Sequence, residues 1–376
     1  MRIGAWAVAG ALALGPGAAK ADEEEGSRAP KERKTSLAVV PGPFYNPSQG
    51  LGLMVLPMLM FYPSAEDQVS PPSTAVLIGM FSVLPPLDEA DTRYSWTAGS
   101  ATRLYLDEDR WRIQAAVAYF NLFREFHGVG GDPSSSALFG YRQYGGVVFA
   151  QVLREVGVSH LYAGLMGGYT TFRSTTSDPA NQQILESLGA GADWKGQPIL
   201  GFVSQYDSRD SQYYPSAGAD FNLRVNGSLK SGDEYLVVVP TFAQYFSLSG
   251  GNKLVLAYKI FGQFGFGDDL PFASYAYYGS RGTTLGYSTG EYVDKMMLGA
   301  EAEIRWLFWK RLGAEGGLGL GKVFPSFDQF GPQPWLPGIW GSFTYKVMAE
   351  QDMRARLTLA AGKTGGALYF AVGQNF

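Results

Sequence analysis

The sequence predicts a β-barrel that crosses a membrane with its strands. Segments of roughly ten residues alternate between apolar and polar side chains and are separated by turns, which is the pattern of barrel strands. After the first 21 residues, no segment has the run of about 18 apolar residues that a membrane helix needs. The chain also ends on an alternating segment whose last residue is Phe376. Together these observations favour strands over helices as the spanning elements.

The alternating segments carry charge on one face only. In residues 301–308 one face holds Ala302, Ile304, Trp306 and Phe308, and the other holds Glu301, Glu303 and Arg305. A soluble sandwich also alternates, but its polar face meets bulk water. We expect the inverse arrangement here, with apolar side chains toward lipid and charged side chains toward an enclosed lumen.

We expect sixteen strands, an even number as in bacterial single-chain barrels. They are 37–44, 51–61, 74–84, 92–106, 111–126, 142–154, 158–172, 197–207, 218–229, 234–247, 253–266, 295–308, 311–323, 338–349, 353–362 and 367–376. Short turns at 107–109 and 155–157 would face the periplasm. Long loops at 127–141, 173–196 and 267–294 would face the outside. The predicted fold is therefore an all-β, antiparallel, transmembrane barrel.

The N-terminal segment has the features of a secretory signal. Arg2 provides a positive start, Ile3 to Leu14 form an apolar run, and Ala19-Lys20-Ala21 has the form of a cleavage site. A buried N-terminal helix is the alternative, but an acidic stretch starting at Asp22 follows at once. We expect residues 1–21 to be a signal peptide, 22–36 a flexible acidic tether and 37–376 the barrel.

Composition excludes several classes of function. The net charge of −4 argues against nucleic acid as a partner, and the absence of cysteine excludes disulfides and thiolate chemistry. His127 and His160 lie in different segments, so a histidine metal site is not expected. The Gly-rich residues 317–321 lack the Lys-Ser/Thr of a phosphate loop. We expect no enzyme activity, no metal and no cofactor.

Residues 271–305 contain Arg281-Gly282 within a Tyr- and Gly-rich stretch, followed by an apolar run to Glu303-Ile304-Arg305. This resembles the sixth loop and next strand of the outer-membrane assembly and transport superfamily that contains BamA, TamA and FhaC, whose hallmark is Val-Arg-Gly-Tyr/Phe. The sequence departs from that pattern at Ser280 and Thr283. It also has Gly319 where the family often carries an Asp.

Other motifs extend the resemblance over most of residues 37–376. Phe126-His127-Gly128-Val129-Gly130 is similar to an element of barrel-only family members. The terminal strand resembles the family's C-terminal assembly signal, for which we single out Phe370, Val372 and Phe376. A further stretch resembles the family's periplasmic turn, and it comprises Asp207, Arg209, Asp210, Pro215 and Gly218. We expect an ion-pair network in that turn, in preference to a catalytic cluster.

The resemblance implies that loop 267–294 folds into the lumen. Arg281 would pair with Glu303, with Glu301 and Glu315 as reserve partners, because a guanidinium in a lumen needs a carboxylate. The alternative is that Arg281 lies in a solvated outer loop.

The resemblance also implies a role in outer-membrane biogenesis or in polypeptide or lipid translocation. The tether leaves no room for POTRA repeats, so we expect a barrel-only member in the bacterial outer membrane. Its partners would be outer-membrane lipid, the barrel-assembly machinery during biogenesis, and a separate periplasmic protein. Pro41 and Pro43 either weaken a seam that opens sideways or mark the end of the tether. The alternative functions are a passive pore or structural barrel, and a lipolytic barrel.

Overall fold

The computed structural model describes residues 35–46, 49–84, 93–133, 138–228, 234–279, 282–348, 352–374 and 376. The predicted signal peptide and almost all of the predicted tether lie outside these residues. Among the described helices, none is both long and apolar enough to span a membrane.

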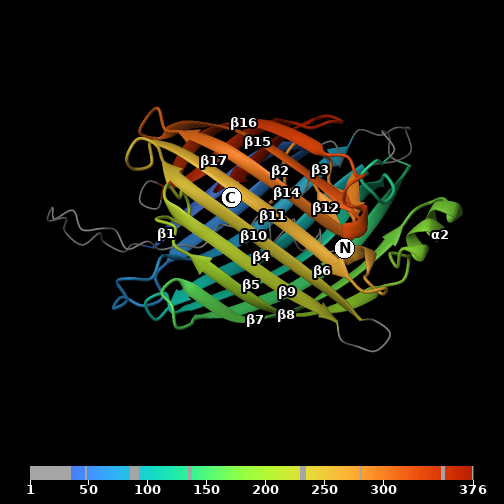
Figure 1. The fold of residues 1–376 in the computed structure, drawn as a ribbon, viewed down its shortest axis with the longest axis horizontal. Helices are drawn as coiled ribbons and strands as arrows, with labels where there is room; N and C mark the ends of the chain where they lie inside the picture. Colours follow the sequence, from blue (N-terminus) through green and yellow to red (C-terminus); the bar gives the residue numbers. More distant parts are fainter. Residues whose placement is uncertain are drawn as a thin grey trace.

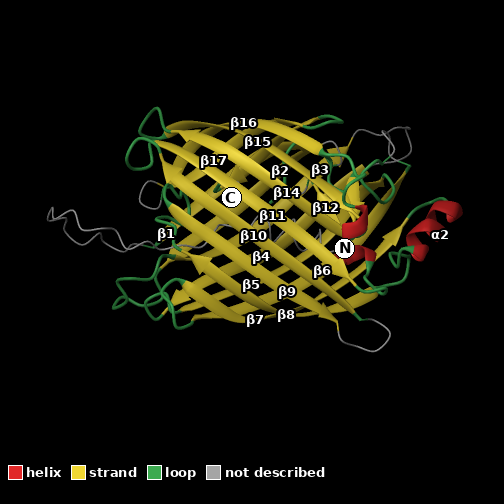
Figure 2. Ribbon diagram, in the orientation of Figure 1, coloured by secondary structure: helices red, strands yellow, loops and turns green. Residues whose placement is uncertain are grey.

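Sixteen antiparallel strands form a closed barrel, which confirms the predicted fold class (Figures 1 and 2). The barrel strands are β1 (Ser36–Asn46), β2 (Gly50–Phe61), β3 (Ser73–Leu84), β4 (Arg93–Leu106), β5 (Trp111–Phe126), β6 (Phe139–Glu155), β7 (Leu161–Thr175), β8 (Lys195–Asp207), β9 (Gly218–Ser228), β10 (Tyr235–Ser247), β11 (Leu254–Phe266), β14 (Met296–Trp306), β15 (Leu312–Phe324), β16 (Leu336–Met348), β17 (Met353–Ala361) and β18 (Gly366–Val372). Each pairs with its neighbours in sequence, and β1 closes the barrel against β18. Two short strands, β12 (Ala276–Tyr278) and β13 (Tyr292–Asp294), pair with each other in the long loop between β11 and β14.

The three longest connections between the strands all lie at one end of the barrel. Strand β1 starts at the same end as β18 stops, and the turns 107–110 and 156–160 lie at that end. The long connections 127–138, 176–194 and 267–295 lie at the other end, where Figure 1 shows β12 and a helix. The first end is the one we expect to face the periplasm.

The helix is α2 (Pro179–Ser187), and it lies within the predicted long loop 173–196. Asp178 caps it by accepting hydrogen bonds from the backbone N–H groups of Ala180 (2.7 Å) and Asn181 (3.4 Å). Pro179 occupies its first turn, where a missing N–H costs nothing. The Asp-Pro pair was a helix-start signal.

Most strands sort their side chains as a membrane barrel requires. Leu165, Leu318 and Leu359 point outward and are between 62% and 71% exposed. Glu303 and Arg305, on the inward face of β14, are at most 1% exposed. Exposure to water would cost about 1.5–3 kcal/mol for each large apolar side chain, so this surface needs lipid.

The inward face of β1–β3 differs from our expectation, because it is apolar where charged side chains were predicted. Its buried residues include Val40, Met54, Leu56, Met58 and Val76. The physical reason is what covers them. In the described chain they share one apolar cluster with Tyr213 of a periplasmic turn and with Met353 and Val372 of the last two strands.

Candidate functional site: the inserted loop and the closing seam

The loop between β11 and β14 (residues 267–295), here called the inserted loop, carries a buried column of tyrosines. Tyr278, Tyr287 and Tyr292 are each at most 2% exposed. The ring centroids of Tyr278 and Tyr287 are 5.4 Å apart, as are those of Tyr287 and Tyr292, and both pairs meet edge to face. Such geometry is the favoured one for aromatic pairs, so these rings stabilise a defined loop conformation.

This loop lies against the inner wall of β15 and β16 because glycines leave room for it. A Cβ added at Gly319 would stand 2.6 Å from Oγ1 of Thr284, and one added at Gly338 would overlap the methyl group of Thr284. The Tyr278 hydroxyl donates to the backbone oxygen of Leu336 (2.8 Å), and the Tyr287 hydroxyl donates to that of Pro337. The missing carboxylate at Gly319 thus makes space for the loop itself.

A lysine that the sequence analysis did not single out as a site residue connects the loop to the wall. Lys259 on β11 forms an ion pair with Glu301 on β14 (2.7 Å), opposite which it lies in register. The same ammonium group donates to the backbone oxygen of Gly282 (3.1 Å). The buried Lys259–Glu301 pair therefore binds the loop at Gly282 of the predicted Arg281-Gly282 motif.

The predicted pairing of Arg281 stays a prediction, because Arg281 lies outside the described residues. Its expected partner Glu303 is engaged on both oxygens, by Nε of Arg305 (2.8 Å) and by the indole N–H of Trp340 (3.0 Å). The reserve partner Glu315 lies 3.5 Å from a guanidinium nitrogen of Arg356. An Arg281 contact with Glu303 would thus join an existing network.

The predicted periplasmic turn holds a chain of buried ion pairs. Asp207 at the end of β8 accepts from Nε of Arg209 (2.9 Å) and from Nη1 of Arg112 on β5 (3.0 Å). Arg112 also pairs with Asp109 in the turn before β5 (2.7 Å). Because the pairs join two turns at the same end of the barrel, they fix the position of residues 208–217 relative to the wall.

Within this turn, Asp210 accepts from the backbone N–H groups of Ser216 (2.8 Å) and Ala217 (3.1 Å). Gly218 adopts φ +90° directly against the backbone of Ser208, which favours glycine at that position. The compact turn carries Tyr213 and Tyr214 toward the barrel interior.

Tyr214 and Pro215 of this turn contact arginines that line the lumen. Arg305 donates to the backbone oxygen of Pro215 (3.2 Å), and its Cζ lies 5.6 Å from the ring centre of Tyr214. Arg354 lies over the same ring at 4.8 Å. The turn is thereby tied to strands β14 and β17.

The closing seam has little pairing between its strands. Among the described residues, β1 and β18 share one register pair, Tyr45 with Leu368 at the outer end. In contrast, β18 pairs with β17 at every residue from Gly366 to Val372. Pro41 and Pro43 of β1 lack the N–H that a ladder requires.

Toward the end of the barrel where β1 starts, the two edges overlap. The ring of Phe370, although on the outward face of β18, covers Gly42 of β1, where a Cβ would overlap the ring. Val372 packs in the same apolar cluster as Val40, which is on the inward face of β1. The end of β18 therefore lies inside β1, and this explains the apolar inner wall of β1–β3.

Phe376 does not lie on the terminal strand as predicted. We expected Phe376 to continue the strand face of Phe370 and Val372, but β18 ends at Val372 and Gly373 adopts φ +89°. Phe376 turns into the lumen, where its backbone oxygen accepts from Arg305 (2.8 Å) and Lys259 lies 4.8 Å from its ring centre. Arg305 and Lys259 therefore hold this end of the chain in the lumen.

The outer loops connect to the inserted loop through the glycine-rich element after β5. Gly130 bridges to Val293 in β13, with its N–H donating to the backbone oxygen (2.8 Å). Its φ of +126° favours glycine. Phe126 packs with Phe272 of the inserted loop at 6.3 Å between ring centres.

Comparison with known proteins decides the family. The model of the Omp85 superfamily domain matches residues 91–320, which is more than half of the chain. The chain belongs to the Omp85 superfamily.

Two solved structures resemble the fold of this chain. BamA from Haemophilus ducreyi lacking POTRA domains 1–3 is 13% identical, with 91% of this chain and 70% of that chain covered and a TM-score of 0.54. CdiB from Acinetobacter baumannii is 12% identical, with 91% and 60% covered and a TM-score of 0.56. At such identities the likeness concerns the fold alone. The search among curated proteins found no significant match.

Within this Omp85 barrel, the structure brings the predicted turn residues and the predicted lumen glutamates together. The turn residues and the lumen glutamates meet through Arg305, which contacts both Glu303 and Pro215. The sequence places Arg305 on the lumen face without assigning it a partner. The signal for a local pair is that Arg305 follows Glu303 by two residues on the same face of the strand.

Proposed function

We propose that this Omp85 barrel acts in outer-membrane assembly or translocation by opening between β1 and β18. The observation that supports this is the seam, where one register pair among the described residues and an overlap of apolar side chains replace a full ladder. Each ladder hydrogen bond contributes about 0.5–1.5 kcal/mol, so few such bonds must break for the edges to part. The opened edge could then pair with a strand of a client by strand addition.

The prolines of β1 support the same proposal. A strand edge opened inside a bilayer leaves backbone groups without partners, and each such group is costly there. Pro41 and Pro43 present no N–H group, so an opened β1 edge leaves fewer donors unsatisfied. The proposed client is a polypeptide or lipid delivered with help from a separate periplasmic partner.

A passive pore is the second candidate, but the contents of the lumen favour the first. Thr284 of the inserted loop and Tyr214 of the periplasmic turn both lie against the inner wall. Phe376 adds a third group near Lys259. A constitutively open channel would have to displace these contacts.

Proteoliposomes test the proposed function. Vesicles with the purified barrel receive an unfolded outer-membrane barrel as client, and its insertion is followed by protease protection together with ion conductance. We expect client insertion above that of empty vesicles and low steady conductance. Steady conductance without insertion would establish the passive pore, and release of fatty acid from vesicle phospholipid would establish a lipolytic barrel.

A further inference from the structure

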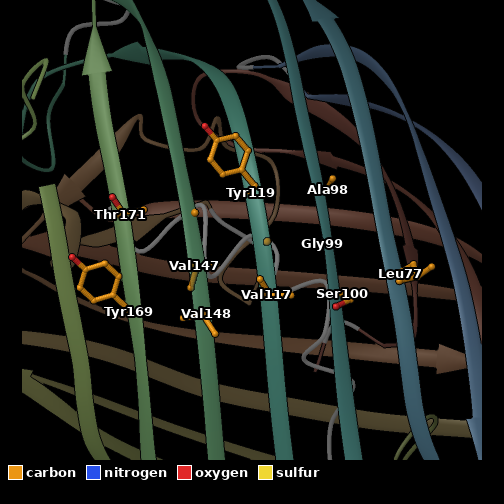
Figure 3. A pocket seen from close by; sticks show the side chains of 12 residues that line it. Leu77, Ala98, Gly99, Ser100, Val117, Tyr119, Val147, Val148, Tyr169 and Thr171 are labelled. Carbon is orange, nitrogen blue, oxygen red and sulfur yellow. The ribbon is translucent and has the colours of Figure 1, made fainter. Parts of the chain in front are cut away.

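The outer surface of strands β3–β7 carries a groove of about 640 Å³ (Figure 3). Val117, Tyr119, Val148 and Tyr169 border it, and small residues such as Ala98 and Gly146 form its base. The four bordering side chains are 45–53% exposed, whereas the intervening Ala118 and Val147 are buried. The groove therefore faces the lipid, at about the middle of these strands.

Two arginines lie between the groove and the outer end of the barrel. Arg173 is the next residue after Thr171 on the same face of β7, and Arg142 lies four residues before Gly146 on the same face of β6. Arg173 is paired in register with Tyr144, so Arg142 and Arg173 are diagonal neighbours. Such neighbours are roughly 7–8 Å apart, within reach of one ligand.

Aromatic rings hold both guanidinium groups. Cζ of Arg142 lies 4.6 Å from the ring centre of Tyr94, and Nη1 of Arg142 donates to the backbone oxygen of Tyr94 (3.1 Å) and to Oδ1 of Asn121 (3.1 Å). Cζ of Arg173 lies 5.0 Å from the ring centre of Tyr144 and 5.3 Å from that of Trp194.

The Nε–H of Arg173 is buried and has no hydrogen-bond partner among the described residues. The guanidinium of Arg173, stacked on two rings, can use its N–H edge for bidentate hydrogen bonds to the oxygens of a phosphate. Basic groups at a membrane interface also attract anionic headgroups. The site thus combines a cationic upper part with an apolar groove directly below it.

We propose that this face binds a phosphorylated glycolipid of the outer leaflet. Its phosphate would lie between Arg142 and Arg173, and one acyl chain would occupy the groove. The charge of the arginines and the position of the groove on the membrane side both select a lipid whose phosphate is at the outer interface. This site is separate from the seam and does not depend on its opening.

The test uses the full barrel in phosphatidylcholine nanodiscs that contain bisphosphorylated lipid A. Lipid retained by the protein is counted by native mass spectrometry. We expect R142Q/R173Q to retain at least tenfold less lipid A than the wild type, and R142K/R173K to recover part of the loss. Ala98→Phe, which fills the groove without touching the arginines, should also reduce retention.

Arg154→Gln is the matched control. Arg154 is on the same face of β6 and its Cζ lies 5.2 Å from the ring centre of Trp111, but it sits at the periplasmic end. Retention by this variant should equal that of the wild type, and heat-modified mobility should show that every variant is folded. Equal retention by R142Q/R173Q and the wild type would overturn the proposal. Equal retention of dephosphorylated lipid A or of phosphatidylglycerol would overturn it as well.

Discussion

The ring of Phe370 on β18 covers Gly42 on β1, so the two edges that close this barrel overlap instead of meeting in a ladder. This relationship accounts for two other features. It buries Val372 against the inner wall of the first strands, and it leaves Tyr45 and Leu368 as the register pair among the described seam residues. The seam is therefore closed mainly by apolar packing.

Gly42→Val should disrupt the overlap, because its side chain would take the place of the Phe370 ring. Overpacking of this kind costs about 1–3 kcal/mol. We expect the folded barrel to lose its compact gel mobility at a lower temperature than the wild type. Gly79→Val is the control, since a Cβ there meets a single atom at 4.0 Å. Identical transitions for both variants would mean that the overlap does not stabilise the seam.

Gly319→Val should displace the inserted loop, because an added Cβ would stand 2.6 Å from Thr284. The lumen would then be less obstructed, and we expect conductance in planar bilayers to rise several-fold. Gly316→Val on the same strand has nothing within 4 Å of its Cβ and should leave conductance unchanged. A Gly319→Val channel as quiet as the wild type would count against loop docking on this wall.

Lys259→Met should destabilise the barrel by about 3–5 kcal/mol, because it leaves Glu301 buried and unpaired. It also removes the contact with the backbone of Gly282. The double variant K259M/E301Q should recover much of the stability, since it removes the orphaned charge. Denaturant unfolding from detergent measures both. Equal losses in the single and double variants would show that the ion pair is not what matters.

The stability of the turn between β2 and β3 should depend on pH through Asp67. Burial acts to raise the pKa of Asp67, but hydrogen bonds from Ser70, Glu108 and Val69 outweigh it and hold the pKa below its usual value of 3.8. The ionised carboxylate therefore stabilises the fold above that value, and this stabilisation is lost as pH falls through the lowered pKa.

Asp67→Asn should accordingly lower the thermal stability of the protein at pH 7. The variant should also lose less stability than the wild type when the pH falls from 7 to 3. Thermal unfolding at several pH values measures this difference. Glu66→Gln, at the exposed neighbouring residue, serves as the control. If both variants follow the wild-type pH profile, Asp67 does not carry the effect.

The strands could be predicted from the sequence because lipid outside and charge inside impose a period of two. Residues 301–306 of β14 show this directly. The apolar inner wall of β2 was readable too, since Leu56, Met58 and Met60 lie on the face opposite Leu51 and Leu53. The predicted alternation of apolar and charged faces does not hold for this strand.

The lumen contacts depend on which distant groups meet, and periodicity carries no information on that. Phe376 continues the alternation of β18, yet the backbone turns at Gly373 and Arg305 captures the end of the chain. The grip of Lys259 on Gly282 likewise joins a strand to a loop. Such contacts become visible once the barrel is closed.

The most direct test of the proposed opening locks the seam with a disulfide. The chain has no cysteine, so Y45C/L368C creates a single pair at the seam residues that lie opposite each other. L165C/F202C locks β7 to β8 as the control. We expect the oxidised seam variant to lose client insertion in proteoliposomes and to regain it on reduction, with the control active in both states. Full insertion by the oxidised seam variant would contradict the account.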